Sequence, residues 1–270
     1  MTTPLRVLIA LGNHGVATAE YAESGTPEPF EIQFRRNVGR PLPGDLVTID
    51  PHGAVSSIVE RGSVFGRGGN RGRLQPVAAN LDTLLIVIAQ APAPSVDLVH
   101  RYVAAAHIHG IRPVVIVNKS DLPVPDEAPF THLDDMKVEV FHTRCEDKPS
   151  LDGLESLLKD GIHLLAGQSG VGKTSLANAL LPDLSLQTDR LSRTTGKGRH
   201  TTTSARLMKL PGGGWLVDTP GVWEYGLWQM PVTELERGFP EFAGAAGSCR
   251  FRNCTHDHEP GCAVRDAVAE

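Results

Sequence analysis

A glycine-rich segment in the second half of the chain has the residue types and spacing of a phosphate-binding loop. Its residues are Gly167, Gln168, Ser169, Gly170, Val171, Gly172, Lys173, Thr174 and Ser175. Glycines let backbone N–H groups wrap phosphate oxygens at the N-terminus of a helix. The Lys173 ammonium would neutralise the β- and γ-phosphates of a nucleotide, and the Thr174 hydroxyl would bind Mg²⁺. A strand pattern at 162–166 and a helix pattern at 173–181 supply the context that such a loop requires.

A second motif, Asn118, Lys119, Ser120 and Asp121, directly follows a continuous apolar run and has the residue types that recognise guanine. The Asp121 carboxylate can accept hydrogen bonds from the guanine N1–H and from its exocyclic amine. Adenine lacks this pair of donors, so it would leave a buried acceptor unpaired and be rejected. Asn118 and Lys119 would hold the loop and pack along the base. With the phosphate loop, the motif predicts a guanine nucleotide site.

Two later segments have the composition that senses a γ-phosphate. Asp218 follows the short apolar run 215–217 and begins the segment Asp218–Gly221. We expect Asp218 to hold Mg²⁺ through water and the Gly221 N–H to bind the γ-phosphate until hydrolysis releases it. One of the threonines at 201–203 should close over Mg²⁺ and the γ-phosphate, and we favour Thr202.

The order of these motifs along the chain differs from that of most GTPases, in which the phosphate loop comes first. Here the base-reading motif precedes the phosphate loop, and the threonines and Asp218 follow it. This order predicts a circularly permuted GTPase domain. Both segments that sense the γ-phosphate then lie at the C-terminal end of the domain, so the chain that follows them is coupled to nucleotide state.

The glutamine that orients the attacking water in many GTPases is missing from its usual place. Val222 and Trp223 follow Gly221, and neither side chain can orient water. His200, which directly precedes the threonines, is our candidate for this catalytic role because imidazole can position water near neutral pH. The alternative is that His200 contacts RNA or solvent. We expect intrinsic turnover to be slow.

Three of the four cysteines crowd into residues 249–262, and Cys145 stands apart as an unremarkable thiol. Clustered cysteines without a secretory signal indicate a metal site rather than disulfides. The expected ligands are Cys249, Cys254, His256 and Cys262, the donor set of one closed, structural zinc site. The sequence leaves open that His258 replaces His256.

The composition is that of a soluble globular protein, with 270 residues, 40% hydrophobic and 21% charged. Neither an 18-residue apolar run nor a signal peptide is visible, so we expect a cytoplasmic protein without a membrane partner. The net charge is −5, but Arg61–Arg73 and Arg190–Lys209 carry four and six cations without an acid. These segments suit a polyanion such as RNA, and the alternative is a pair of solvated loops.

The pattern of elements predicts three domains. Residues 1–75 contain five short strand-like runs, which favour a small barrel of the OB type, with an SH3-like barrel left open. We interpret the glycine- and arginine-rich segment 66–73 as a linking loop. Residues 76–235 alternate strands and helices, as in an α/β domain with a mainly parallel sheet. Residues 236–270 lack enough apolar residues for a core and should form the zinc-binding domain.

Together these motifs resemble the RsgA type of circularly permuted GTPases, which act in late assembly of the small ribosomal subunit. The resemblance rests on the permuted order, on Gly198–Thr203, on Asp218–Gly221, on the string Cys249–Cys262 and on Pro76–Asp82. It implies an OB-fold, a permuted GTPase domain, a zinc domain, binding to the RNA of the small subunit and hydrolysis of GTP stimulated by that subunit. We expect a monomer.

Two departures from the family pattern accompany this resemblance. The sequence ends eight residues after Cys262, whereas family members usually continue with a helical tail, so we expect fewer RNA contacts from the third domain. The serine–alanine loop that backs the guanine is not evident, and Phe141–Arg144 lies in its place.

Two rival interpretations remain at this level. The first is a GTP-dependent switch that acts on a protein or a tRNA rather than on the ribosome. The second is an RNA-binding zinc module whose nucleotide domain has lost its activity, against which the intact Lys173, Thr174 and Asp218 argue.

Substitution of Asp121 tests the base-reading role. Asp121→Asn should weaken GTP binding and shift the preference toward xanthosine triphosphate, because the new amide donates where the guanine amine needs an acceptor, while xanthine presents an oxygen there. Competition binding between the two nucleotides measures this preference. An unchanged preference for GTP would mean that Asp121 does not read the base.

Overall fold

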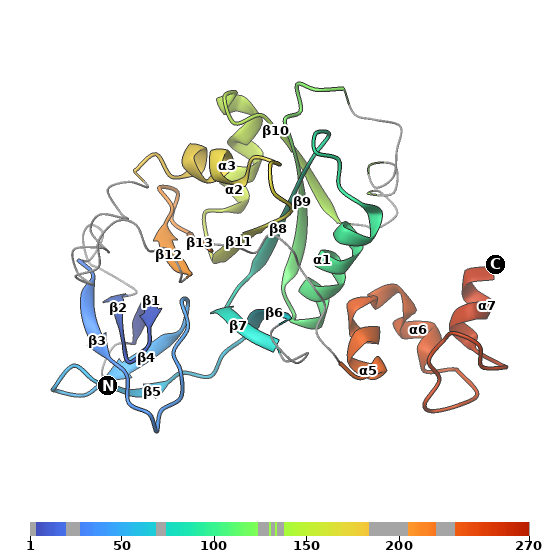
Figure 1. Ribbon diagram of the computed structural model, residues 1–270, viewed down its shortest axis with the longest axis horizontal. Helices are drawn as coiled ribbons and strands as arrows, with labels where there is room; N and C mark the ends of the chain where they lie inside the picture. The colour runs from blue at the N-terminus through green and yellow to red at the C-terminus, as the bar shows by residue number, and fades with distance from the viewer. Residues whose placement is uncertain are drawn as a thin grey trace.

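The computed structural model describes residues 4–19, 28–68, 74–123, 130, 133, 138–183, 205–219 and 230–269. An α/β domain forms the body, with a barrel on one side and a small helical lobe on the other (Figure 1). His200, Thr202, Gly221, Val222 and Trp223 lie outside the described residues, so the roles assigned to them above stay predictions.

The N-terminal strands form the expected five-stranded barrel. They are β1 (Leu5–Leu11), β2 (His14–Ala19), β3 (Phe30–Gln33), β4 (Leu46–Ile49) and β5 (Val55–Ile58). β1 pairs with both β2 and β4, β2 also pairs with β3, and β4 also pairs with β5, all antiparallel. A parallel bridge between Gln33 and Ala54 joins the end of β3 to the start of β5. This closure gives an OB-type barrel, which was one of the two alternatives.

The barrel and the α/β domain share a wall. Val7, Ala17 and Ile32 lie in the interior of the barrel, whereas Leu8 and Val16 belong to the main core. Because successive residues of a strand point to opposite faces, β1 and β2 serve both cores at once.

The α/β domain has the predicted strand–helix alternation. Its sheet runs in the order β10, β9, β8, β11, β13, β12. The first five are parallel neighbours, and β12 pairs antiparallel with β13. The strands are β8 (Thr83–Ala89), β9 (Arg112–Asn118), β10 (Glu139–Thr143), β11 (Ile162–Ala166), β12 (Arg206–Lys209) and β13 (Trp215–Asp218). The helical elements are α1 (Val96–Ile108), η3 (Lys148–Leu151), α2 (Asp152–Leu157) and α3 (Lys173–Leu180).

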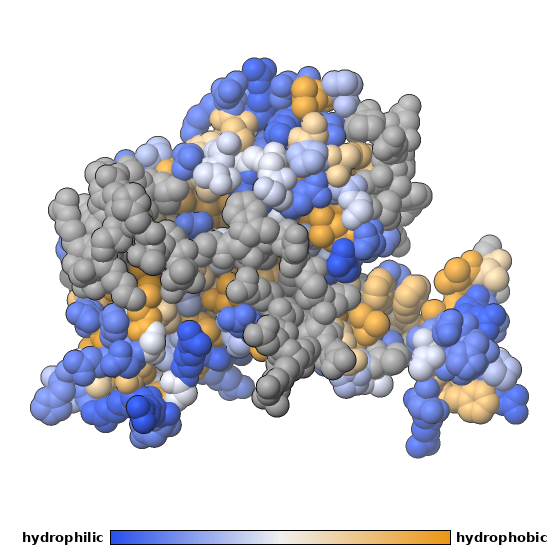
Figure 2. Space-filling model, in the orientation of Figure 1, coloured by the Kyte–Doolittle hydropathy of each residue, from blue (hydrophilic) through white to orange (hydrophobic). Residues whose placement is uncertain are grey.

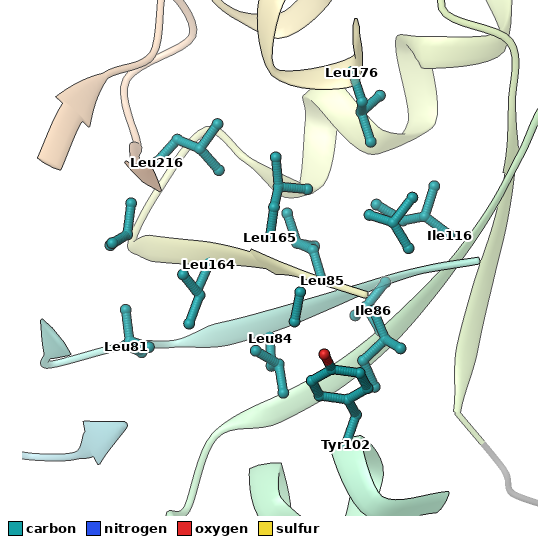
Figure 3. Close-up of a cluster of buried hydrophobic side chains, with 14 of the residues drawn as sticks. Leu81, Leu84, Leu85, Ile86, Tyr102, Ile116, Leu164, Leu165, Leu176 and Leu216 are labelled. Atoms are coloured by element: carbon teal, nitrogen blue, oxygen red, sulfur yellow. The ribbon is translucent and has the colours of Figure 1, made fainter. Parts of the chain in front are cut away.

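Apolar side chains fill both faces of this sheet. Figure 3 shows Tyr102 of α1 beneath the sheet and Leu176 of α3 above it. β8 and β11 are buried along their whole length, as the continuous apolar runs predicted. The sheet is therefore covered by helices on both sides.

The segment interpreted as a linking loop is a hairpin instead. β6 (Val64–Gly68) pairs antiparallel with β7 (Leu74–Ala79), so the linking-loop interpretation is wrong for residues 66–68. Arg61 was counted among the cations for a polyanion, but its guanidinium makes two 2.7 Å hydrogen bonds to the buried carboxylate of Asp45. Burial of an acid demands such a partner, so Arg61 is a structural residue.

The barrel joins the α/β domain through a close approach of two backbones. Gly44 has φ +93°, and a Cβ on it would lie 2.1 Å from the carbonyl oxygen of Ala79. The Ala79 amide donates to the Pro43 carbonyl at 2.9 Å, and the Asn80 side chain donates to the Gly44 carbonyl at 3.0 Å. One main-chain and one side-chain hydrogen bond fix this joint, which leaves little freedom between the two units.

The C-terminal lobe contains only short elements. They are α5 (Val232–Leu235), η4 (Glu236–Gly238), η5 (Pro240–Phe242), α6 (Ala243–Ala246) and α7 (Ala263–Ala269). Its own core is small, with Cys254, Cys262 and Val264 at the centre. In Figure 2 its surface is largely hydrophilic, with apolar residues over α6, on the side nearest the body. Among the described residues, no helix is long and apolar enough to cross a membrane.

The joint at Gly44 predicts a large loss of stability on substitution. Gly53→Ala is the matched control, because Gly53 also has positive φ but has open space around it. The left-handed backbone alone should cost Gly53→Ala about 1–2 kcal/mol. Gly44→Ala adds a collision with backbone and should cost about 4 kcal/mol or more. Denaturant titration measures both, and equal losses would show that the chain beside Gly44 moves aside freely.

Candidate nucleotide site and metal cluster

The predicted nucleotide motifs meet at one edge of the sheet. The base-reading motif begins at the last residue of β9, the phosphate loop follows β11, and Asp218 ends β13. These strands are parallel, so their carboxyl ends lie at the same edge, where α/β sheets bind ligands. β8 lies between β9 and β11 and contributes the turn after its own end, which contains Ala91 and Pro92.

Two glycines of the phosphate loop are required by their surroundings. Gly167 has φ +137°, and a Cβ there would lie 2.1 Å from the carbonyl oxygen of Val87. Gly172 has φ +94°, and a Cβ there would lie 2.3 Å from the side-chain nitrogen of Asn118. Any other residue would push the loop away from β8 or from the base-reading motif. The spacing of the glycines thus reflects packing as well as phosphate binding.

Lys173 begins helix α3 and folds back over the phosphate loop. Its ammonium donates to the carbonyls of Gly167 at 2.8 Å and Gln168 at 2.6 Å. Partial burial lowers the pKa of Lys173 to about 8. Thr174 and Ser175 lie exposed in the first turn of α3. The loop therefore presents a cation and free hydroxyls at a helix N-terminus, as phosphate and Mg²⁺ require.

Asn118 joins the base-reading motif to the phosphate loop. Its side chain is 2% exposed, and its Nδ2 donates to the Val171 carbonyl at 2.9 Å. Its Oδ1 accepts from the Thr143 hydroxyl at 3.2 Å and from the Cys145 thiol at 3.5 Å. A buried amide with partners on both atoms fixes the distance between the two motifs.

Lys119 adds a second tie between the same segments. It adopts φ +58°, and its ammonium donates to the carbonyls of Ala91 at 2.6 Å and Gly170 at 2.8 Å. The Ser120 amide donates to the Thr143 carbonyl at 3.1 Å. Asp121 stays exposed at the tip of this turn, where its carboxylate can meet a base.

Two contributors to the site, Thr143 and Cys145, were missed in the sequence, and Gln168, which was predicted as part of the phosphate loop, makes a contact that was not expected. Gln168 donates through Nε2 to the carbonyls of Pro92 at 2.9 Å and Ala93 at 3.1 Å, and so ties the phosphate loop to the turn after β8. Thr143 lies in the segment where the serine–alanine loop was sought, which was the one signal available. Cys145 was interpreted as unremarkable, but it contacts Asn118, and burial raises the pKa of its thiol, which favours the donor form.

Asp218 lies at the end of β13, opposite Arg206 of β12. Desolvation raises the pKa of the Asp218 carboxyl, and the charge of Arg206 acts against this rise. Lys209, at the other end of β12, donates to the Gly213 carbonyl and lies over the Trp215 ring at 4.5 Å. Two cations of the predicted basic segment therefore have partners within the sheet.

The cysteine cluster assembles as expected. Each of Cys249, Cys254, His256 and Cys262 offers one ligand atom, and these atoms all lie within 4.8 Å of one another. His256 Nδ1 lies 3.6 Å from the Cys249 sulfur and 3.4 Å from the Cys262 sulfur. Ligands on a tetrahedron around Zn²⁺, at bond lengths of about 2.0–2.3 Å, are about 3.5 Å apart, so the geometry fits such a metal. His258 is 81% exposed and contacts Asp257, outside the group of four that the structure brings together.

Contacts around the cluster hold its ligands in place. The Arg265 amide, in α7, donates to the Cys262 sulfur at 3.4 Å. Glu259 accepts from the Thr255 amide at 2.8 Å and hydroxyl at 2.6 Å, which closes the turn between Cys254 and Cys262. Glu236 accepts from His256 Nε2 at 2.9 Å and was not recognised in the sequence. It lies 20 residues before that histidine, and no spacing rule connects the two.

The fold and the nucleotide site define a class. A phosphate loop after the central strand β11, and a guanine-type motif that precedes it in the chain yet lies beside it in space, are the marks of a circularly permuted P-loop GTPase. The solved structure of YloQ, described as a circularly permuted GTPase, matches with a TM-score of 0.72 at 26% identity, over 100% of this chain and 88% of that one. YjeQ from Thermotoga maritima matches with a TM-score of 0.74 at 26% identity, over 100% and 92%.

Sequence comparison identifies the family. The model described as RsgA GTPase matches residues 58–228. The small ribosomal subunit biogenesis GTPase RsgA of Ectopseudomonas mendocina (strain ymp) is 40% identical over 250 residues, which cover 89% of this chain and 73% of that protein. The protein of the same name from Pseudomonas fluorescens is 36% identical over 278 residues, with 99% and 81% covered. The chain belongs to the RsgA GTPase family and is a GTP-hydrolysing enzyme.

The lowered pKa of Lys173 predicts that nucleotide affinity depends on pH. Below about 8 the ammonium is charged, and above it the free protein holds a neutral amine, which must take up a proton from the solvent when nucleotide phosphates bind. Affinity for GDP should therefore be flat near pH 7 and fall by up to about tenfold per pH unit above 8. Calorimetry in buffers of different ionisation enthalpy measures the proton uptake. Lys173→Arg, which stays charged, should abolish the uptake, and an equal uptake in this variant would exclude Lys173 as the source.

Proposed function

We propose that this chain acts in the assembly of the small ribosomal subunit as a GTP-dependent switch that binds the RNA of that subunit. The Asn118–Val171 hydrogen bond, which makes the base-reading motif and the phosphate loop one site, is the observation that carries the GTP-dependent part of this proposal. The names of the relatives supply the cellular process. Each residue of the site has a role in the mechanism that this proposal implies.

In this mechanism Asp121 accepts from guanine, while Asn118, Lys119 and Ser120 hold the loop that presents it. Backbone amides from Gly167 to Ser175 surround the phosphates, and the Lys173 ammonium turns from the Gly167 and Gln168 carbonyls toward the β- and γ-oxygens. Mg²⁺ would bind through Thr174, Thr202 and Asp218 and would neutralise the charge that develops on the phosphates. Gly221 would hold the γ-phosphate until it leaves.

The chain divides into three domains in this proposal. We propose an RNA-binding barrel at 1–75, a GTPase domain at 76–235 and a zinc-binding domain at 236–270. β7 (Leu74–Ala79) crosses the first of these boundaries and pairs with β6, which lies before it. One structural zinc ion per chain would be held by the cluster of three cysteines and His256. The protein would act as a monomer in the cytoplasm.

Titration of GTP turnover with purified subunits tests the ribosomal role. Small subunits should raise the rate to saturation, whereas equal concentrations of large subunits or of tRNA should not. Lys173→Ala, which removes the phosphate-neutralising cation, gives the background rate. Stimulation by tRNA, or turnover that no ribosomal particle changes, would favour the alternative of a switch on another partner.

Replacement of His200 separates catalysis from RNA binding. If His200 positions the attacking water, His200→Ala should lower subunit-stimulated turnover by about 10²–10⁴-fold with little change in GTP affinity. Affinity for small subunits is then measured with a non-hydrolysable GTP analogue. Retained affinity with collapsed turnover supports the catalytic role. Weakened affinity with normal turnover at saturating subunits assigns His200 to RNA contact instead.

A further inference from the structure

Glu236 stands between the metal cluster and the body of the protein. Its carboxylate accepts a hydrogen bond from His256 Nε2 at 2.9 Å, and the two side chains are 28% and 14% exposed. His256 meanwhile turns Nδ1 toward the sulfurs of Cys249 and Cys262. The imidazole therefore uses one nitrogen for the cluster and the other for an acid that precedes the whole cluster in the chain.

We propose that Glu236 is a positioning residue for the metal ligand His256 and that, through this bond, metal binding fastens the C-terminal lobe to helix α1. The inference rests on the cluster being a metal site, and it goes beyond the roles proposed above. It assigns to an acid outside the ligand set both retention of the metal and docking of the lobe.

The partners of its two ring nitrogens determine the tautomer of His256 when a metal is bound. A neutral imidazole carries one N–H, and the nitrogen that binds a metal must offer its lone pair. Because Nδ1 faces the sulfurs, the hydrogen has to be on Nε2, where the Glu236 carboxylate accepts it. Carboxylates in this place orient metal-binding histidines and make them better ligands.

Glu236 belongs to an element that packs against helix α1. It is the first residue of η4 (Glu236–Gly238), which packs against α1. A Cβ on Gly238 would lie 2.9 Å from the Cβ of Ala104 and 3.0 Å from its carbonyl oxygen, so the two backbones are in direct contact.

The His256–Glu236 hydrogen bond and the packing of η4 on α1 would together connect a bound metal to α1. A bound ion would fix His256, His256 would fix Glu236, and Glu236 starts the turn that touches Ala104. The apolar core of the lobe is small and is centred on two of the ligand cysteines, while Leu235, next to Glu236, packs against the main core. The competing explanation is an ordinary ion pair near the surface, which contributes little and leaves metal retention unchanged.

Metal release gives the first test, on the full-length protein loaded with zinc. Transfer to a chromogenic chelator should be about 10–100-fold faster in Glu236→Ala than in the native protein. Glu236→Gln keeps an oxygen acceptor and should restore most of the retention. Glu241→Ala, which removes an exposed acid of the same segment, should release zinc at the native rate. Native release from Glu236→Ala, or equal acceleration in all three variants, would overturn the positioning role.

Hydrogen exchange gives the second test and reports on docking rather than on the metal alone. Removing zinc from the native protein should raise exchange in η4 and in the second half of α1, around Ala104, while β8 and β11 stay protected. Zinc-loaded Glu236→Ala should show the same increase, and Glu236→Gln should show little of it. If α1 exchanges equally with and without zinc, the metal does not hold the lobe on α1 and the second half of the proposal fails. Failure of subunit stimulation would leave both tests unaffected.

Discussion

The nucleotide site depends on one buried hydrogen bond, from the Asn118 amide to the Val171 carbonyl. The bond spans 53 positions in the chain. It also explains the glycine at 172, because the Asn118 side chain occupies the space that a Cβ there would need. Thr143 and Cys145 donate to the amide oxygen, so both polar atoms of the buried Asn118 side chain have partners. Permutation changes the order of the motifs along the chain, but the sheet order β9, β8, β11 keeps them together.

Permutation also decides which strand meets the barrel. β12 follows the threonines of the predicted switch, pairs with β13 up to Asp218, and pairs on its other edge with β1 at Ile9. The strand between the two γ-phosphate sensors is therefore the edge strand that the barrel extends. With the backbone contact at Gly44, this makes the barrel and the sheet a single body, and a shift of β12 would carry β1 with it.

Much of this was predictable from residues that act through local pattern. The apolar runs of β8, β9 and β11, the helix α1 and the four clustered ligands all appear as expected, because period, spacing and residue type determine them. Contacts between distant side chains were not predictable. Arg61 seemed a cation for RNA because its partner Asp45 lies 16 residues away, and Glu236 has no pattern at all. The run of cations gave a wrong prediction for Arg61, because Arg61 pairs with a buried acid and the sequence does not show that pairing.

The two junctions of the α/β domain differ in kind, and this difference bears on how a switch would work. The barrel is joined by main-chain hydrogen bonds and a shared core, which cannot slide without leaving buried polar groups unpaired. The lobe touches α1 through α5 and the short turn at Gly238, and two ligand cysteines lie at the centre of its own small core. The chain that follows Asp218 leads directly to this lobe. Relative movement driven by the γ-phosphate should therefore fall at the lobe, where few contacts have to break, while the barrel follows the sheet.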